Sequence, residues 1–177
     1  MNKITYRRLN FDECDRIQEI DITQYIKNAW RVIDGKRQLV EIDYLETNWP
    51  DGFERYRNAL ENIMKDGGIA FGAFNSDGSM VGFVSLNMTT FGETSKYILL
   101  DSMFVSNNSR GKGIGKKLFE LCCEKGRKCG VDKIYICAGS AEDTVAFYRN
   151  CGCIDAIEIN RFLYEQDTRD LQLEYKL

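Results

Sequence analysis

The chain has 177 residues, with 24 basic and 27 acidic side chains and a formal net charge of -3. This length is enough for one domain with a sizeable core, and the interspersed charges argue against a nucleic-acid partner. No apolar run reaches membrane-spanning length, and the first residues lack the apolar segment of a signal peptide, so we expect a cytoplasmic protein without a membrane partner.

Seven cysteines and the absence of histidine limit the possible chemistry. Without a Cys-x-x-Cys pair or a histidine the sequence predicts no metal site, and we expect free, mainly buried thiols. Ser-His and Cys-His nucleophilic sites are excluded as well. A general base must therefore be Asp, Glu, a perturbed Tyr or Lys, or a water held by backbone carbonyls.

The first half of the chain predicts strands and helices in alternation. Apolar residues at helical spacing after Asn10, a possible N-cap, indicate a first helix, and Asp34-Gly35 is a strong hairpin signal. The expected elements are an edge strand at 4–9, a helix at 11–20, a long hairpin of 22–33 and 38–45, a helix at 53–64, and a second hairpin of 69–74 and 80–88.

The second half adds a strand, a helix and another strand, an order that implies parallel pairing through a right-handed crossover. The expected elements are a polar loop at 89–95, a strand at 97–105, a helix ending near 128, a strand at 133–138, a helix at about 141–150, and strands at 153–159 and 171–177 around a charged loop at 160–170. Because no linker or repeat interrupts them, residues 1–177 form one mixed α/β domain.

The most informative stretch runs from Tyr97 to Lys128. A nearly continuous apolar strand leads into a turn with alternating glycines, and an amphipathic helix follows. The first amides of a helix have no internal acceptors, and the helix dipole adds partial positive charge there. With the basic side chains of this turn, the sequence predicts a phosphate-binding site. The alternative is a tight turn whose glycines serve packing alone.

Two nucleotide-binding fingerprints do not fit this turn. The phosphate loop of nucleotide hydrolases requires Ser or Thr after Gly-Lys, but Lys117 follows Gly115-Lys116. The dinucleotide fingerprint requires a third glycine where Lys116 stands. The pattern Arg110-x-x-Gly113-x-Gly115 after a strand instead resembles the acetyl-CoA signature of the GNAT superfamily of N-acetyltransferases.

This resemblance covers the chain from about residue 69 to the end. It implies a central mixed sheet flanked by helices, whose two central parallel strands separate at their C-terminal ends, with the long hairpin as an N-terminal extension. It also implies acetyl-CoA as cosubstrate, with pantetheine along the backbone of one central strand and the diphosphate on the glycine turn. The implied cofactor-binding residues are Met103, Phe104, Val105, Arg110, Gly111, Lys112, Gly113, Ile114, Gly115 and Lys116.

The segment from Phe147 to Gly152 resembles the family's Phe-Tyr-x-x-x-Gly segment. The tyrosine of that segment is often the proton donor to the CoA sulfur, which implies that Tyr148 is the general acid. A phenol with a pKa near 10 suits a thiolate leaving group. Five residues earlier the family often has an asparagine that contacts pantetheine. Here Asp143 stands in its place, and its carboxylate accepts but cannot donate as an amide does.

Asp101 is the first candidate for the general base. Strict alternation along the strand places it on the same face as Leu99, Met103 and Val105, where burial would raise its pKa. A carboxylate satisfied by structural partners is the alternative. Glu93 is the second candidate, and ordered waters are a third route for the proton.

The N-terminal half is expected to define the acceptor pocket, because GNAT enzymes vary most there. Its aromatic residues either cover the sheet, which we favour, or line an acceptor groove: Tyr25, Trp30, Tyr44, Trp49 and Phe53. The layout resembles that of streptothricin-type and related small-molecule acetyltransferases.

The function that the resemblance implies is direct transfer of an acetyl group from acetyl-CoA to a primary amine of a small molecule or peptide. The alternatives are a non-catalytic module that senses acyl-CoA, which Asp143 favours, and a nucleotide-binding protein that uses the same turn. We expect a monomer or a homodimer.

Overall fold

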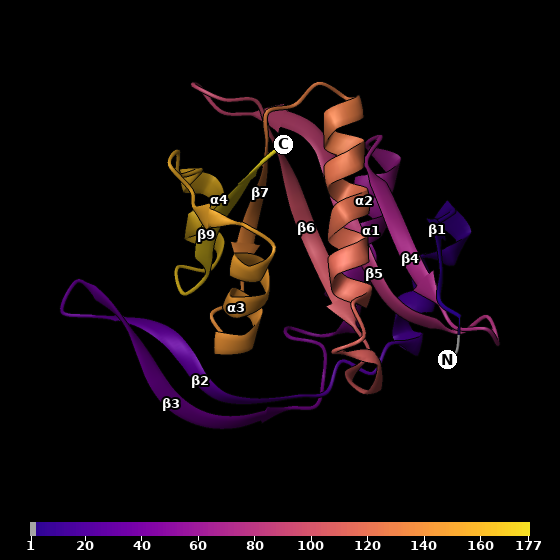
Figure 1. The fold of residues 1–177 in the computed structure, drawn as a ribbon, viewed down its shortest axis with the longest axis horizontal. Helices are drawn as coiled ribbons and strands as arrows, with labels where there is room; N and C mark the ends of the chain where they lie inside the picture. Colours follow the sequence, from indigo (N-terminus) through magenta and orange to yellow (C-terminus); the bar gives the residue numbers. More distant parts are fainter. Residues whose placement is uncertain (1–2) are drawn as a thin grey trace.

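The computed structural model of the protein describes residues 3–177. Figure 1 shows a twisted sheet with helices on both faces and a long hairpin along one end. The strands are β1 (Thr5–Arg8), β2 (Gln24–Ile33), β3 (Lys36–Glu46), β4 (Ile69–Phe74), β5 (Met80–Phe91), β6 (Tyr97–Val105), β7 (Lys133–Ala138), β8 (Ile154–Asp155) and β9 (Leu171–Lys176). The helices are η1 (Phe11–Glu19), α1 (Phe53–Lys65), η2 (Asn107–Ser109), α2 (Ile114–Lys128), α3 (Glu142–Asn150) and α4 (Arg161–Gln166).

The main sheet has the strand order β1-β4-β5-β6-β7-β9-β8. Strands β6 and β7 pair in parallel, and the other neighbours pair antiparallel. One core cluster joins α2 and α3 to one face of the sheet, and a second cluster joins η1 and α1 to the other face. Because η1, α1, α2 and α3 bury their apolar sides against the sheet, the fold has three layers, and the predicted mixed α/β class is confirmed.

Strands β6 and β7 separate toward their C-terminal ends. Their parallel pairing extends from Tyr97↔Lys133 to Leu100↔Ile136, whereas β6 continues to Val105. Beyond that point β7 keeps its partner on the other side, since Ala138 pairs with Leu171 of β9. The predicted separation of the central strands is confirmed, and it opens the sheet beside Asp101 to Val105 (Figure 1).

A β-bulge at Asp101 overturns the predicted alternation along β6. Ser102 pairs with Ser85 and Leu100 pairs with Leu86, so Asp101 is an extra residue on its strand. Met103 and Val105 consequently pack in the same cluster as Leu100, on the α2 face. The bulge leaves Asp101 on the opposite face, so its predicted grouping with Met103 and Val105 was wrong.

The long hairpin of β2 and β3 forms its own two-stranded sheet, as expected. Asp34 and Gly35 make the turn with φ values of 50° and 73°, the left-handed backbone that such turns require. The hairpin reaches the start of α3, where Ala29 forms a β-bridge with Ala141 and Trp30 N donates to Ser140 O at 2.8 Å. It therefore passes along the end of the sheet where β6 and β7 diverge (Figure 1).

Four other predicted segments differ from the structure. The first helix is a 3-10 helix, and its buried residues Cys14 and Ile17, with the buried C-cap residue Ile20, recur at every third position, which is the 3-10 period. Strand β5 extends through Phe91 into the predicted loop, and the strand expected at 153–159 shortens to Ile154–Asp155. The expected loop at 160–170 contains α4, which Asn160 caps by accepting a hydrogen bond from Leu163 N.

Candidate active site

The turn between β6 and α2 presents backbone amides at the open end of the sheet. Gly111 and Gly113 adopt left-handed φ values of 73° and 80°, and a Cβ atom at either position would touch nothing. The helix begins at Ile114, and Lys117 N donates the first helical hydrogen bond to Gly113 O at 3.0 Å. The amides of Ile114 to Lys116 therefore have no acceptor within the helix and suit an anion.

Gly115 serves helix packing instead. A Cβ atom there would come within 3.2 Å of the Phe147 ring, so this glycine allows the first turn of α2 to approach α3 closely. Gly111 and Gly113 are therefore needed for their left-handed backbone, whereas Gly115 is needed for a close contact between helices.

Arg110 is turned into the protein. Its Nε donates to Val105 O at 3.0 Å and its guanidinium also donates to Ile22 O at 3.3 Å, while burial lowers its pKa. The side chain therefore fastens the turn to the end of β6 and to the segment before the hairpin. Lys112 Nζ donates to Asn108 O at 2.7 Å, and Lys116 is exposed on α2. Two carbonyl groups hold the Arg110 side chain, and its predicted contact with a phosphate stays a prediction.

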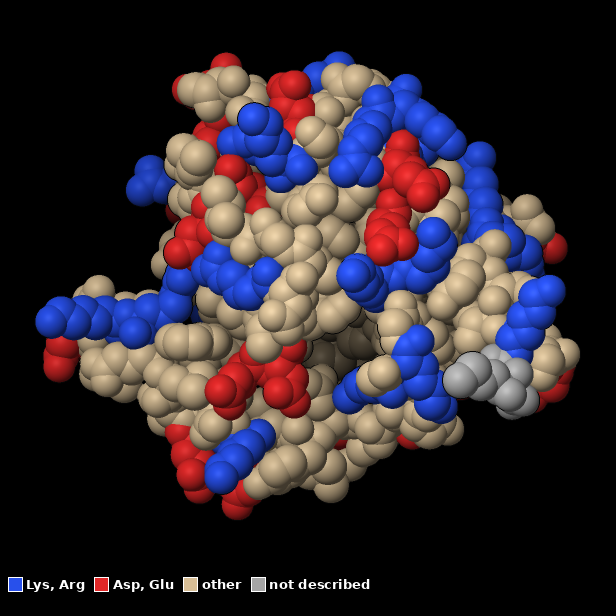
Figure 2. All heavy atoms as spheres, viewed as in Figure 1, with Lys and Arg blue, Asp and Glu red and all other residues tan. Residues whose placement is uncertain are grey.

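A hollow lies at the N-terminal ends of α2 and α3. Figure 2, drawn from the same side as Figure 1, shows basic side chains along its α2 side and acidic side chains along its α3 side. An anionic ligand that enters this hollow is attracted by one wall and repelled by the other. The acidic side chains therefore weaken the attraction of this hollow for an anion.

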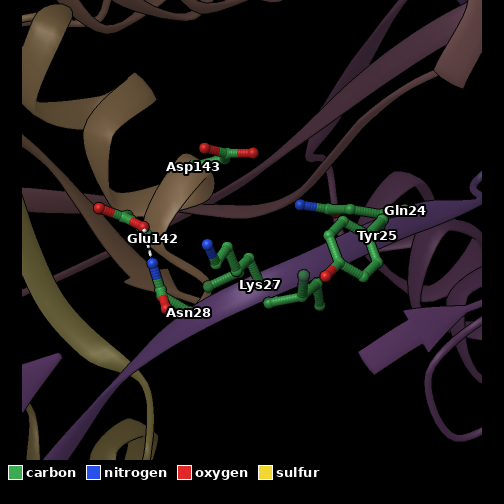
Figure 3. A pocket seen from close by; sticks show the side chains of 8 residues that line it. Gln24, Tyr25, Lys27, Asn28, Glu142 and Asp143 are labelled. Atoms are coloured by element: carbon green, nitrogen blue, oxygen red, sulfur yellow. Dashed lines mark hydrogen bonds between the residues drawn. The ribbon is translucent and has the colours of Figure 1, made fainter. Parts of the chain in front are cut away.

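Glu142 and Asp143 line a small pocket between β2 and α3 (Figure 3). Asn28 Nδ2 of the hairpin donates to Glu142 Oε2 at 2.7 Å. In Figure 3 the Lys27 amine points toward the first turn of α3, where Asp143 is exposed. No sequence signal points to Lys27 or Asn28, because they lie more than a hundred residues before α3 and only the tertiary fold brings them there.

Tyr148 is a buried side chain of α3. The residue is 6% exposed, its ring packs against Phe119 and Phe147, and burial raises its pKa strongly. The hydroxyl therefore stays protonated at neutral pH.

Asp101 projects from the bulge toward α1. Protein atoms around it raise its pKa although its side chain remains accessible, and Ser102 Oγ donates to its carboxylate at 2.8 Å. Arg55 and Tyr56 of α1 lie close enough to interact electrostatically with this carboxylate. Asp101 therefore lies where β6 leaves β7, on the sheet face opposite α2.

The second base candidate lies elsewhere. Glu93 is exposed in the turn before β6, at the end where β6 and β7 remain paired, and its backbone amide contacts Glu158. The structure does not bring it to the separation of the two strands.

The aromatic residues of the N-terminal half mainly cover the sheet, as we favoured. Trp49 packs against Phe104 with a centroid distance of 4.8 Å and also contacts Phe53, while Trp30 packs against the main core cluster. Tyr25 and Tyr44 are exposed instead.

Among residues 3–177 no group of three or more His, Cys, Asp or Glu side chains is placed to hold a metal ion. No helix in the same range has the length and apolar character needed to cross a bilayer.

Solved structures with the same fold are numerous. Nourseothricin acetyltransferase superposes with a TM-score of 0.74 at 19% identity, covering 98% of each chain. A Bacillus anthracis protein provisionally assigned as a streptothricin acetyltransferase, solved with acetyl coenzyme A, gives 0.69 at 17% identity over 99% of this chain and 98% of that one. The PaiA N-acetyltransferase of Thermoplasma acidophilum, solved with coenzyme A, gives 0.62 at 17% identity over 99% of each chain. At these identities the likeness concerns the fold.

Sequence comparison identifies the family. No curated protein sequence matches the chain. The profile of the acetyltransferase (GNAT) family matches residues 36–153, a segment that runs from the hairpin through the glycine turn to the end of α3. The chain therefore belongs to the GNAT family of acetyltransferases.

Proposed function

We propose that this acetyltransferase transfers an acetyl group from acetyl-CoA directly to a primary amine of a small molecule or peptide. The observation that carries the proposal is the separation of β6 from β7 beside a glycine turn whose helix amides lack acceptors. An extended thioester fits between the strands while its diphosphate contacts the turn. The coenzyme complexes of the Bacillus anthracis and Thermoplasma acidophilum proteins support this choice of cosubstrate.

The cofactor-binding residues divide into three groups. The pantetheine arm pairs with the backbone of Met103 to Val105, whose β7 side has no strand partner among the described residues. The diphosphate accepts hydrogen bonds from the amides between Gly111 and Lys116, with Lys112 and Lys116 adding charge. Arg110 contributes by holding the turn in place. Asp143 lies at the pantetheine side of the hollow, facing Lys27 of the hairpin.

Acetyl transfer to an amine has three demands. The amine must be neutral when it attacks, the charge on the thioester oxygen must be stabilised, and the leaving thiolate must be protonated. Tyr148 supplies the proton to the sulfur, because its buried phenol is protonated at neutral pH. Asp101 accepts a proton from the nitrogen as the carbon–nitrogen bond forms.

A thiol-release assay tests this function. The purified protein is incubated with acetyl-CoA and a panel of amines: spermidine, an aminoglycoside, streptothricin and an N-terminal peptide. The likeness to nourseothricin and streptothricin acetyltransferases is the reason for including streptothricin. We expect one class of amine to release CoA and to gain 42 Da, about the mass of an acetyl group minus a proton, by mass spectrometry.

Thermal unfolding with acetyl-CoA, CoA or ATP, measured beside the thiol-release assay, decides between the alternatives. If acetyl-CoA stabilises the protein against heat but no amine ever releases CoA, the protein is a sensor of acyl-CoA. If ATP stabilises it and CoA does not, the turn binds a nucleotide and the proposal fails.

A further inference from the structure

Asp170 lies at the open end of the sheet, just before β9. Leu171 pairs with Ala138 and Gln172 pairs with Cys137, so Asp170 sits immediately beyond the last residue of β7. The Gln172 amide fixes this position, since its Nε2 donates to Asp170 O at 3.3 Å while its Oε1 accepts from Cys137 Sγ at 3.3 Å. Asp170 therefore borders the space that opens between β6 and β7.

Asp170 and Asp101 belong to the same face of the sheet. Leu171 and Leu173 pack in the cluster that includes α2, so alternation places Asp170 with Gln172 on the opposite face. The bulge leaves Asp101 on that face as well. Both carboxylates interact electrostatically with Cys137 of β7 and with Tyr56 of α1. The two carboxylates thus flank β7 where the thioester end of the cofactor is expected.

The two carboxylates differ in their partners. Ser102 Oγ donates to Asp101 at 2.8 Å, whereas no group of residues 3–177 donates a hydrogen bond to the carboxylate of Asp170. Burial, and next the neighbouring Asp167, raise the pKa of Asp170 to about 6, while Arg169 and Arg55 oppose the shift. The remaining groups that face it are Asp101, Tyr56 and Cys137. A half-buried carboxylate without a donor is a ready acceptor for a proton.

We propose that Asp170 is a second catalytic base, which takes the first proton from the ammonium group of the acceptor before Asp101 takes the second. This inference rests on the proposed transfer to a primary amine. An ammonium nitrogen carries three protons and the amide product carries one, so two protons must leave the nitrogen. The two carboxylates on one face of the sheet match this requirement.

The steps balance as follows. Asp170 accepts a proton from R–NH3+ and releases it to water, leaving R–NH2. The nitrogen attacks the thioester carbon, the C–N bond forms and the C–S bond breaks. Tyr148 donates its proton to the sulfur, and the second proton of the nitrogen passes to Asp101 and then through water to Tyr148. The products are the acetylated amine, CoA–SH and one proton.

The experiment compares pH profiles of kcat/KM for the wild type, Asp170→Asn and Asp101→Asn, with the best amine of the panel. The wild type should gain activity as the pH rises through about 6 and then reach a plateau, because deprotonated Asp170 acts on the abundant ammonium form. Asp170→Asn should lose about 100-fold at pH 7, a typical general-base effect. The kcat/KM of this variant should then rise about tenfold per pH unit, because the fraction of free amine, which has already lost its first proton, rises with pH. Asp101→Asn should lose activity at every pH.

Asp167→Asn is the matched control. Asp167 raises the pKa of Asp170 but binds Arg169 and lies outside the catalytic groups, so this variant should keep the plateau and move the acid limb to lower pH. The inference is overturned if Asp170→Asn retains the acid limb near pH 6, or if its deficit is the same at pH 6 and pH 9.

A readout without turnover separates this inference from the proposed function. In 13C-aspartate-labelled protein one carboxyl resonance should titrate near pH 6 and disappear in Asp170→Asn. Spermidine should shift this resonance in the presence of CoA. If no amine is acetylated while both observations hold, the proposed reaction fails and the carboxylate remains an amine-binding group. If the resonance titrates near 4 and is insensitive to spermidine, the inference about Asp170 fails.

Discussion

The ionisation of Asp170 should reduce the stability of the folded protein at neutral pH. Its folded pKa of about 6 lies above the ordinary value of 3.8, so the folded state holds this proton more tightly than the unfolded state does. The stability linked to the proton is fully present below pH 4 and is lost as the pH rises through 6. Asparagine cannot ionise, and Asp170→Asn should therefore be more stable than the wild type at pH 8.

The size of the gain follows from the shift. At 1.36 kcal/mol per pKa unit, moving the pKa from 3.8 to about 6 corresponds to at most about 3 kcal/mol above pH 7. Partial solvation of the carboxylate screens this effect, so we expect about 1–3 kcal/mol. For a domain of this size each 1 kcal/mol raises the Tm by about 2–4 °C.

Urea unfolding followed by circular dichroism measures the difference at pH 8.0 and pH 4.5. The advantage of Asp170→Asn at pH 8.0 should fall to less than half at pH 4.5, where the wild-type carboxyl is protonated in the folded state. Asp155→Asn is a control that should change the stability at pH 8.0 in the opposite direction. Burial raises the pKa of Asp155, but its ion pairs with Arg149 and Arg37 outweigh this and hold the pKa below its usual value.

Equal or lower stability of Asp170→Asn at pH 8.0 would refute the reasoning. The carboxylate would then have satisfying partners in the folded state and would not be available as a base. A gain in stability together with a loss of activity is the pattern expected of a catalytic group held in an unfavourable environment.

Three further predictions concern the cofactor. Tyr148→Phe should lower kcat by about 10- to 100-fold with little change in CoA affinity, because only the proton donor is lost. An unchanged kcat would show that Tyr148 is not the general acid. Gly113→Asp should weaken CoA binding at least about tenfold through like charge at the diphosphate, whereas Gly113→Asn, which also tolerates the left-handed backbone, should bind within about threefold of wild type. Equal loss in the two variants, measured by calorimetry, would assign the effect to backbone strain. Asp143→Asn should tighten CoA binding by about 2- to 10-fold, because it removes a negative charge from the acidic side of the hollow and supplies an amide donor. Weaker binding would show that the carboxylate itself accepts a hydrogen bond from the cofactor.

Much of this protein is determined by local sequence signals. The apolar run before the glycine turn predicts the strand β6, and the strand–helix–strand order predicts its parallel pairing with β7. Asp34-Gly35 predicts the hairpin because its left-handed backbone suits these two residue types. The glycine and Phe-Tyr motifs predict the family, which the profile over residues 36–153 confirms. Each signal depends on residues that lie close together in the chain.

Only the tertiary structure decided where the reactive side chains point. The bulge at Asp101 depends on how β6 pairs with β5, and no pattern within β6 reveals it. The same holds for Arg110, whose two carbonyl partners come from β6 and from the segment before the hairpin. Asp170 reaches the open end of the sheet only through the pairing of β9 with β7. Local propensity sets which elements form, whereas contacts between distant segments determine the face, the burial and the proton affinity of each group.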